Sequence, residues 1–189
     1  MSAPASPRPA GAVPPRPGGR KAPPPPRLAF EQVVPEIDGG RFPVKRTPGD
    51  RVVVFADVVS DGHDELACLL KFRREEDRRW TEVPMAFHDN DRWRGVFRVG
   101  APGRYRDPLE GWADAFRTWR RNMAKWLDAG QDVTVELKIG AKLVAEAAKR
   151  ASGADGRRLE VLADALLKRV DPTAAARLAL DDGLAAIMF

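Results

Sequence analysis

The sequence of 189 residues contains a single cysteine, Cys68. Disulfide bonds within the chain and a cysteine metal cluster are therefore excluded. Cys68 shares the apolar register of Leu66, Leu70 and Phe72, which predicts a small buried hydrophobic residue. No apolar run approaches the roughly 20 residues of a membrane-spanning helix, and residues 1–29 lack the apolar core of a signal peptide. We therefore expect a cytoplasmic protein with no membrane partner.

The sequence also lacks the short motifs of common enzyme classes: there is no Walker loop, no GxGxxG after a strand and no HExxH. Two clusters carry metal-ligand side chains, namely Asp61, His63, Asp64 and Glu65, and His88 with Asp89 and Asp91. Their spacing fits no closed metal site, and both fall in predicted turns. A catalytic triad can be assembled on paper from Ser60, His63 and Asp57, but no nucleophile elbow or oxyanion motif accompanies it. We nominate no catalytic, cofactor-binding or metal-binding residue.

The charge balance is basic without a basic block. The formal net charge is +5, and arginine is spread along the whole chain. A basic balance is compatible with nucleic acid, yet no helix-turn-helix, zinc finger or aromatic RNA-binding signature is present. In the run from Arg73 to Arg79 arginines alternate with acids, which favours a solvated turn. Nucleic acid is therefore not an expected partner, although a steep salt dependence of binding would support it.

Residues 1–27 consist mainly of proline, alanine, glycine and arginine, and they end in four prolines and Arg27. Such a segment buries too little apolar surface to offset the entropy of ordering. We predict a disordered proline-rich tail with polyproline II character near its end.

Short β-branched and aromatic segments alternate with turn residues from Leu28 to about Trp112. Together they predict an immunoglobulin-like β-sandwich of about seven strands. A hairpin is expected at His88–Asp91, and Pro108 should leave the closing strand short, broken or at an edge. Extended segments are expected at Leu28–Val34, Phe42–Arg46, Arg51–Val59, Leu66–Arg73, Trp80–Met85 with an edge or bulge at Pro84, and Arg92–Val99.

Two of these strands have informative alternation. In Arg51–Val59 both sets of alternate residues are apolar, with Asp57 the one polar interruption, so we expect burial on both faces. In Arg92–Val99 one face is basic and the other carries Trp93, Gly95 and Phe97, as in a half-solvated strand.

From Asp114 the apolar period changes from 2 toward 3.6, which predicts helices over residues 113–189. The first should end near Gly130, and Asp132 should cap a second one through about Ala151, with Val135 and Leu137 among its apolar residues. Gly140 should weaken that helix by up to about 1 kcal/mol relative to alanine. A third should restart at Asp155 and Gly156 with the stripe Leu159, Leu162, Leu166 and Val170, ending on Lys168 and Arg169. A fourth should run from the cap Asp171 and Pro172 to the end of the chain.

An aromatic and basic run begins at the end of the predicted sandwich and continues into the first helix: Trp112, Phe116, Trp119, Arg120, Arg121 and Trp126. Tryptophans can stack on sugar rings and arginines can bind hydroxyls or phosphates. The helical spacing favours an aromatic face packed against the neighbouring sheet.

Six segments together resemble the amino-terminal region of bacterial alpha-1,4-glucan:maltose-1-phosphate maltosyltransferases, from about Leu28 to at least Ala151. They are Pro35–Arg46, Gly49–Val54, Asp61–Asp64, Asn90–Gly95, Pro102–Tyr105 and Thr118–Arg121. Asp107 and Pro108 depart from the regular strand of the family, and the resemblance thins after Ser152.

The resemblance implies a retaining enzyme of the alpha-amylase-like clan that moves a maltosyl unit from maltose 1-phosphate to an alpha-glucan with two carboxylates. In the family this chemistry lies in a (β/α) barrel that follows the sandwich and helical bundle, and these two help to build a homodimer. The barrel would lie beyond Phe189, so no catalytic residue is carried over and maltose 1-phosphate and glucan would bind elsewhere.

The sequence thus predicts an α+β chain with a tail at 1–27, a β-sandwich at 28–112 and an incomplete helical bundle at 113–189. The leading hypothesis is a non-catalytic scaffold and dimerisation portion of a maltosyltransferase of glycogen and alpha-glucan biosynthesis, inactive alone and without a cofactor. The alternative is a free-standing alpha-glucan-binding module whose exposed aromatics, such as Trp80 or Trp93, hold the sugar.

Overall fold

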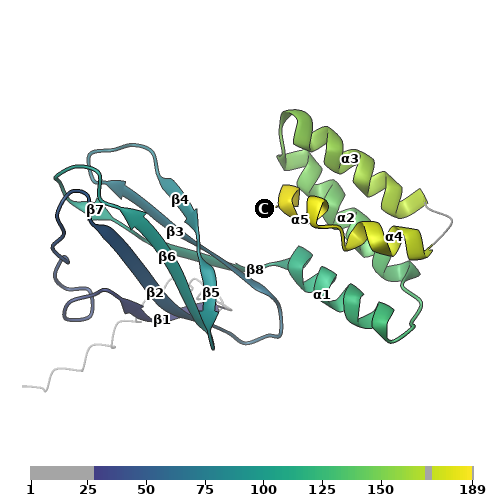
Figure 1. Ribbon diagram of the computed structural model, residues 1–189, viewed down its shortest axis with the longest axis horizontal. Helices are drawn as coiled ribbons and strands as arrows, with labels where there is room; N and C mark the ends of the chain where they lie inside the picture. Colours follow the sequence, from purple (N-terminus) through teal and green to yellow (C-terminus); the bar gives the residue numbers. More distant parts are fainter. Residues whose placement is uncertain (1–27, 169–171, 189) are drawn as a thin grey trace, which may run out of the picture.

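A computed structural model describes residues 28–168 and 172–188. Among these residues there are two antiparallel β-sheets followed by five helices, and the helices gather beyond the end of the last strand (Figure 1). This confirms the predicted mixed α+β class. The predicted tail at 1–27, Arg169 and Val170 at the end of the third helix, and the cap Asp171 lie outside the described residues.

The first sheet has the strand order β1-β2-β6-β5, and the second has the order β4-β3-β7 with β8 also paired to β3. The strands of the first sheet are β1 (Leu28–Val34), β2 (Arg51–Ser60), β6 (Arg92–Arg98) and β5 (Ala86–Asp89). Those of the second are β4 (Thr81–Pro84), β3 (Leu66–Arg74), β7 (Tyr105–Arg106) and β8 (Leu109–Ala113). The hairpin expected at His88–Asp91 is present, and Asn90 at its tip has a positive φ of 40°.

The two sheets share one hydrophobic cluster. Gly95 of β6 lies directly under Leu70 of β3, and a Cβ atom at Gly95 would meet Leu70 Cδ2 at 2.9 Å. A glycine at this position therefore lets the sheets approach closely. The cluster consists of Val52, Val54, Val58, Cys68, Leu70, Met85, Trp93, Phe97 and Val99.

The expectation that β2 is buried on both faces is wrong. Val52, Val54 and Val58 are buried against the second sheet, whereas Val59 on the other face is 41% exposed. Asp57 lies on that uncovered face, where its carboxylate pairs with Arg92 at 2.7 Å. Apolar side chains on the outer face of β2 are therefore not evidence of burial, because no layer of the described chain covers them completely.

Two extended segments differ from expectation. Phe42–Arg46 forms no strand, and only an isolated bridge joins Phe42 to Ile37. The expected strand Trp80–Met85 is shorter and is followed by β5, which pairs in the other sheet. The chain crosses between sheets at Pro84, consistent with the predicted edge. Pro108 separates β7 from β8, as expected for a broken closing strand.

The helices are α1 (Ala115–Asp128), α2 (Thr134–Arg150), α3 (Gly153–Lys168), α4 (Pro172–Ala179) and α5 (Asp182–Met188). The carboxylate of Asp114 caps α1 by accepting from Arg117 N at 2.9 Å, and Asp132 accepts from Thr134 N at 2.9 Å. α3 begins at Gly153, before the predicted start. The region predicted as a single fourth helix forms two helices, α4 and α5. Asp181 lies between them, and its carboxylate caps α5 by accepting a hydrogen bond from Leu184 N.

A second hydrophobic cluster lies among the helices and includes Met123, Leu137, Val144 and Leu159. The aromatic face of α1 packs here, so the expectation that it packs on the sheet is wrong. Trp119 lies on α2, where its Nε1 donates to Glu136 O at 2.8 Å. The stripe predicted for α2 is also partly wrong, because Val135 is 64% exposed.

None of the described helices combines the length and the apolar character needed to cross a membrane.

Candidate functional site

A cluster of polar contacts joins the loop before β3 to helix α1. Arg121 Nη1 pairs with Glu65 Oε1 at 2.6 Å, and Arg121 Nη2 donates to His63 O at 2.6 Å. Glu65 N donates to Thr118 Oγ1 at 2.8 Å, and Glu65 O accepts from Asp114 N at 2.7 Å. We call these five residues the sheet–helix clamp. These four hydrogen bonds fix the first two turns of α1 to the loop before β3.

The clamp uses two residues of the first candidate metal cluster. Within the described residues no group of three or more His, Cys, Asp or Glu is placed to hold a metal ion. His63 contributes its backbone oxygen to the clamp and Glu65 its carboxylate. The structure therefore gives these two a structural role, in line with the sequence interpretation.

The remaining sequence candidates also have structural neighbours. Asp57 pairs with Arg92, and the Ser60 hydroxyl accepts a hydrogen bond from Gly62 N at 3.4 Å. Two members of the hypothetical catalytic triad of Ser60, His63 and Asp57 therefore have other partners. The ring of His88 lies 5.5 Å from that of Phe55. Cys68 is buried, as predicted, and desolvation raises the pKa of its thiol from 9.0 to about 11.

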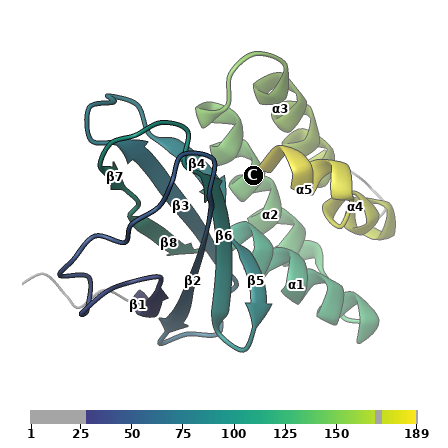
Figure 2. The ribbon, with the colours of Figure 1, turned by 60° about the vertical axis from the view of Figure 1, so that its left-hand side comes forward.

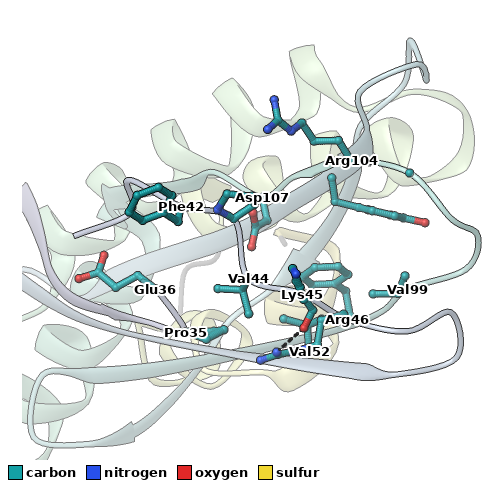
Figure 3. Close-up of a pocket in the computed structure, with 15 residues that line it drawn as sticks. Pro35, Glu36, Phe42, Val44, Lys45, Arg46, Val52, Val99, Arg104 and Asp107 are labelled. Atoms are coloured by element: carbon teal, nitrogen blue, oxygen red, sulfur yellow. Dashed lines mark hydrogen bonds between the residues drawn. The ribbon is translucent and has the colours of Figure 1, made fainter. Parts of the chain in front are cut away.

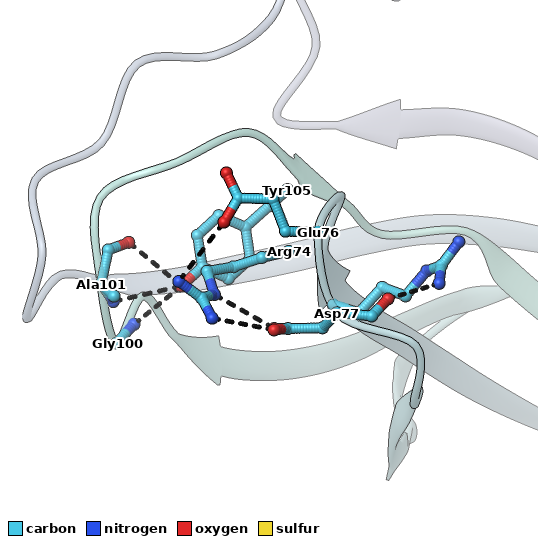
Figure 4. A network of polar contacts seen from close by, with 7 residues as sticks. Arg74, Glu76, Asp77, Gly100, Ala101 and Tyr105 are labelled. Carbon is cyan, nitrogen blue, oxygen red and sulfur yellow. Dashed lines mark hydrogen bonds and ion pairs between the residues drawn. The ribbon is translucent and has the colours of Figure 1, made fainter.

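The charged run between β3 and β4 is a turn, as predicted, held by its own ion pairs. The Arg74 guanidinium donates to both carboxylate oxygens of Asp77, at 3.1 and 2.8 Å (Figure 4). This pairing lowers the pKa of Asp77. Nearby, the Tyr105 hydroxyl accepts from Gly100 N and Ala101 N at 3.2 Å. These contacts stabilise the loop end of the sheets.

The tryptophans named for glucan binding do not form an exposed row. Trp93 is only 7% exposed and belongs to the core between the sheets. Trp80 is 37% exposed, and the Arg73 guanidinium lies over its ring at 4.5 Å. The hypothesis of a free-standing glucan-binding module is not favoured, because Trp93 is buried and the ring of Trp80 is covered by Arg73.

The loop after β1 covers a cavity of about 620 Å³ at one end of the sheets (Figure 3). Its walls combine the ring of Phe42 with the carboxylates of Glu36 and Asp107, and Figure 3 shows Arg104 directing its guanidinium away from them. Desolvation raises the pKa of Asp107. Sequence reasoning missed this cavity. An aromatic residue two positions after a pair of glycines, in the segment Gly39–Pro43, is the signal that could have indicated it.

A second cavity of about 760 Å³ lies between the sheets and the helices, beside Trp112 and Phe116. Figure 2 shows α1 continuing from the end of β8, with α2 behind it. The cavity is walled mainly by apolar side chains, and Trp112 is 41% exposed at its edge.

Helix α2 carries an exposed apolar surface, which we call the outer α2 surface: Val135, Ile139 and Leu143. Val135 is 64% and Ile139 46% exposed, whereas Leu143 is half-buried. The three residues are spaced by four and therefore share one side of the helix. The prediction that Val135 belongs to the buried stripe is wrong, since Leu137 and Val144 on the opposite side fill the core.

The fold and these surfaces describe a two-sheet body clamped to a helical bundle. The sequence matches the family described as alpha-1,4-glucan:maltose-1-phosphate maltosyltransferase, domain N/S, over residues 26–189. The chain belongs to this family.

Named relatives agree with the match. The chain is 46% identical over 162 residues to the alpha-1,4-glucan:maltose-1-phosphate maltosyltransferase of Chlorobaculum tepidum, which covers 86% of this chain and 24% of the relative. It is 45% identical over 126 residues to the enzyme of the same name from Myxococcus xanthus, covering 65% of this chain and 19% of that protein. The chain therefore spans about a fifth to a quarter of the length of these curated relatives.

Proposed function

We propose that this chain is the non-catalytic amino-terminal portion of a cytoplasmic maltosyltransferase that transfers maltosyl units from maltose 1-phosphate to alpha-1,4-glucans in glycogen and alpha-glucan biosynthesis. The observation that carries the proposal is the match to domain N/S across residues 26–189. The short span relative to the named enzymes supports a part rather than the whole of the catalyst.

Within this proposal residues 28–112 form an immunoglobulin-like sandwich and residues 113–189 a helical bundle. Two separate hydrophobic clusters, one between the sheets and one among the helices, support that division. The sheet–helix clamp supports a scaffold role, because it restricts the angle between the two units at their junction.

The scaffold role includes a homodimer contact through the outer α2 surface. Adjacent apolar side chains exposed on one side of a helix are typical of interaction surfaces when they lie together. Beside Ile139 and Leu143, a smaller hollow extends to Trp126 of α1 and enlarges the apolar area. A second copy of the same surface would bury these side chains by an isologous contact.

The test compares two equivalent valines by sedimentation velocity over a range of protein concentrations. Val135→Glu places a charge on the outer α2 surface, and Val161→Glu places one on α3 at a valine that is 68% exposed, close to the 64% of Val135. We expect a dimer for the parent chain and Val161→Glu, and a monomer for Val135→Glu. A parent chain that stays monomeric at all concentrations contradicts the dimer, and equal effects of both variants contradict the surface.

The non-catalytic part of the proposal is tested by mixing the purified chain with maltose 1-phosphate and a malto-oligosaccharide and measuring phosphate release. We expect no turnover. Sustained release that increases with protein concentration would refute the scaffold assignment, because a complete active site would then exist within these 189 residues.

A further inference from the structure

The cavity of about 760 Å³ between the sheets and the helices has an apolar floor on the outer side of the second sheet. The strand register pairs Leu69 of β3 with Pro84 of β4. It also pairs Ala67 of β3 with Trp112 of β8. Cross-strand partners point to the same face, and Ala67 and Leu69 alternate with the buried Cys68. The four paired residues therefore share the face turned away from the core between the sheets, and we call this cavity the junction groove.

The helices supply the wall that faces this floor. Phe116 of α1 and Met188 of α5 line the same cavity. On the floor, Pro84 is exposed and Trp112 is 41% exposed, and they flank β3 from its two neighbouring strands. Proline-rich segments in the polyproline II conformation bind to grooves of this kind, in which an exposed aromatic ring lies among other apolar side chains.

The described chain begins beside this groove. Leu28 is its first residue, and a Cβ atom at Gly111 would lie 3.1 Å from Leu28 Cδ2, one position before Trp112 in β8. Leu28 pairs with Ser60, the last residue of β2, so β1 starts at the end of the sheets where the loop of the sheet–helix clamp begins. Among the described strands β8 pairs with β3 alone, which leaves its other edge open. The residues before Leu28 are thus joined to the sheets close to the groove and to an open strand edge.

The sequence of those residues has the chemistry that such a groove selects. Residues 20–27 read RKAPPPPR, with four consecutive prolines between basic residues. In the polyproline II conformation, which rises by about 3.1 Å per residue, four prolines span about 12 Å. A proline-rich segment loses little conformational entropy on binding, and a short covalent connection gives it a high effective concentration.

Charge favours a basic occupant to a modest extent. Residues 1–27 carry five basic side chains and no acidic one, which equals the whole formal net charge of +5. Glu82 of β4 and Glu146 of α2 line the groove and are 52% and 49% exposed. Each pairs with one lysine, yet a carboxylate can accept from more than one donor. Arg117 and Arg150 also line the groove, so the apolar contacts should contribute more than charge.

We propose that the junction groove binds residues 20–27 of the same chain, with the prolines against Trp112 and Pro84 and the basic residues beside the groove carboxylates. The bound segment would connect the sheets to the helices at a second place besides the sheet–helix clamp. This inference does not depend on the proposed function.

The first test uses the indole N–H signals of the five tryptophans in the NMR spectrum of the full chain. Replacement of the four consecutive prolines by serine should shift the signal of Trp112 and leave that of Trp80, which lies outside the groove. A control with four replacements earlier in the sequence should shift neither signal. The test variant is P23S/P24S/P25S/P26S, and the control variant is P4S/P7S/P9S/P14S.

A peptide added to the test variant separates binding from a local effect of the substitutions. The peptide RKAPPPPR should return the Trp112 signal toward its position in the parent, whereas RKASSSSR should not. An equal response to both peptides overturns the recognition of proline. An unchanged Trp112 signal in the folded test variant overturns the docking.

The second test measures trypsin cleavage after Arg27 in the full chain. Trp112→Ala should accelerate this cleavage about two- to tenfold, because cleavage follows the population of the released segment and one aromatic contact is lost. Trp80→Ala removes a tryptophan of similar exposure, 37% against 41%, and should have no effect. Circular dichroism checks that both variants are folded. Equal acceleration by both variants overturns the groove, and protection of Arg27 that increases with protein concentration overturns the same-chain contact in favour of a second copy.

Discussion

Replacement of Gly140 by alanine should destabilise the protein, although the same change stabilises most helices. In an exposed helix interior, alanine is favoured over glycine by about 1 kcal/mol. At Gly140 a Cβ atom would lie 1.9 Å from Trp119 Cζ2 and 2.4 Å from Cε2. No rotation of a methyl group removes such an overlap, so either the indole or the helix must move.

The indole of Trp119 has little freedom to move. It is 4% exposed, and its Nε1 is held by Glu136 O at 2.8 Å. Expulsion of a buried tryptophan costs about 3–5 kcal/mol, the range for truncating one to alanine. After the helix-propensity gain is subtracted, we expect Gly140→Ala to lower the free energy of unfolding by about 2–4 kcal/mol.

A double-mutant cycle isolates this contact. Urea unfolding followed by circular dichroism would be measured for the parent, Gly140→Ala, Trp119→Ala and the double variant. Once the indole is absent, Gly140→Ala should become neutral or stabilising by up to about 1 kcal/mol. A stabilising effect of Gly140→Ala in the presence of Trp119 would refute the reasoning, because the ring would then not occupy the space above Gly140.

Two other changes have defined outcomes. Burial raises the pKa of Cys68 from 9.0 to about 11, so the folded state keeps the thiol proton that the unfolded state loses. Relative to Cys68→Ala, the parent should therefore lose up to about 2–3 kcal/mol of its free energy of unfolding from pH 9 to 11. Urea unfolding at each pH measures this loss, and parallel stability curves for the two proteins would contradict it. Arg121→Ala should lower the free energy of unfolding by only about 0.5–1 kcal/mol, because both partners in the ion pair are about a third exposed. It should nevertheless accelerate proteolysis in the loop before β3, whereas the control Arg157→Ala on α3 should not. Equal cleavage rates in the two variants would contradict the role of the sheet–helix clamp.

Much of the secondary structure follows from local patterns. The ends of α1 could be predicted because Asp114 caps it and Gly130 follows it, and both effects depend on neighbouring backbone groups. The hairpin at His88–Asp91 and the break at Pro108 are local for the same reason. The split between α4 and α5 was missed, because Leu180 and Asp181 interrupt the apolar period only briefly.

The candidate surfaces were harder to predict. Both faces of β2 are mainly apolar in sequence, and the position of the second sheet decides that Val58 is buried while Val59 is exposed. The cavity under the loop after β1 is lined by Glu36 and Asp107, which are separated by 70 residues of chain and line one cavity only in the folded protein. No local sequence pattern indicates that two such distant residues line the same cavity.

The sequence by itself determined the mixed α+β class, most strands and helices, and the family, because periodicity, caps, turns and ordered motifs are properties of neighbouring residues. The tertiary structure decided which apolar residues are buried and which remain on the surface. It also gives Gly140 a packing role, because the missing side chain at this position of α2 leaves the space that Trp119 fills. Burial depends on which elements pack together, and packing joins residues that are distant in the chain.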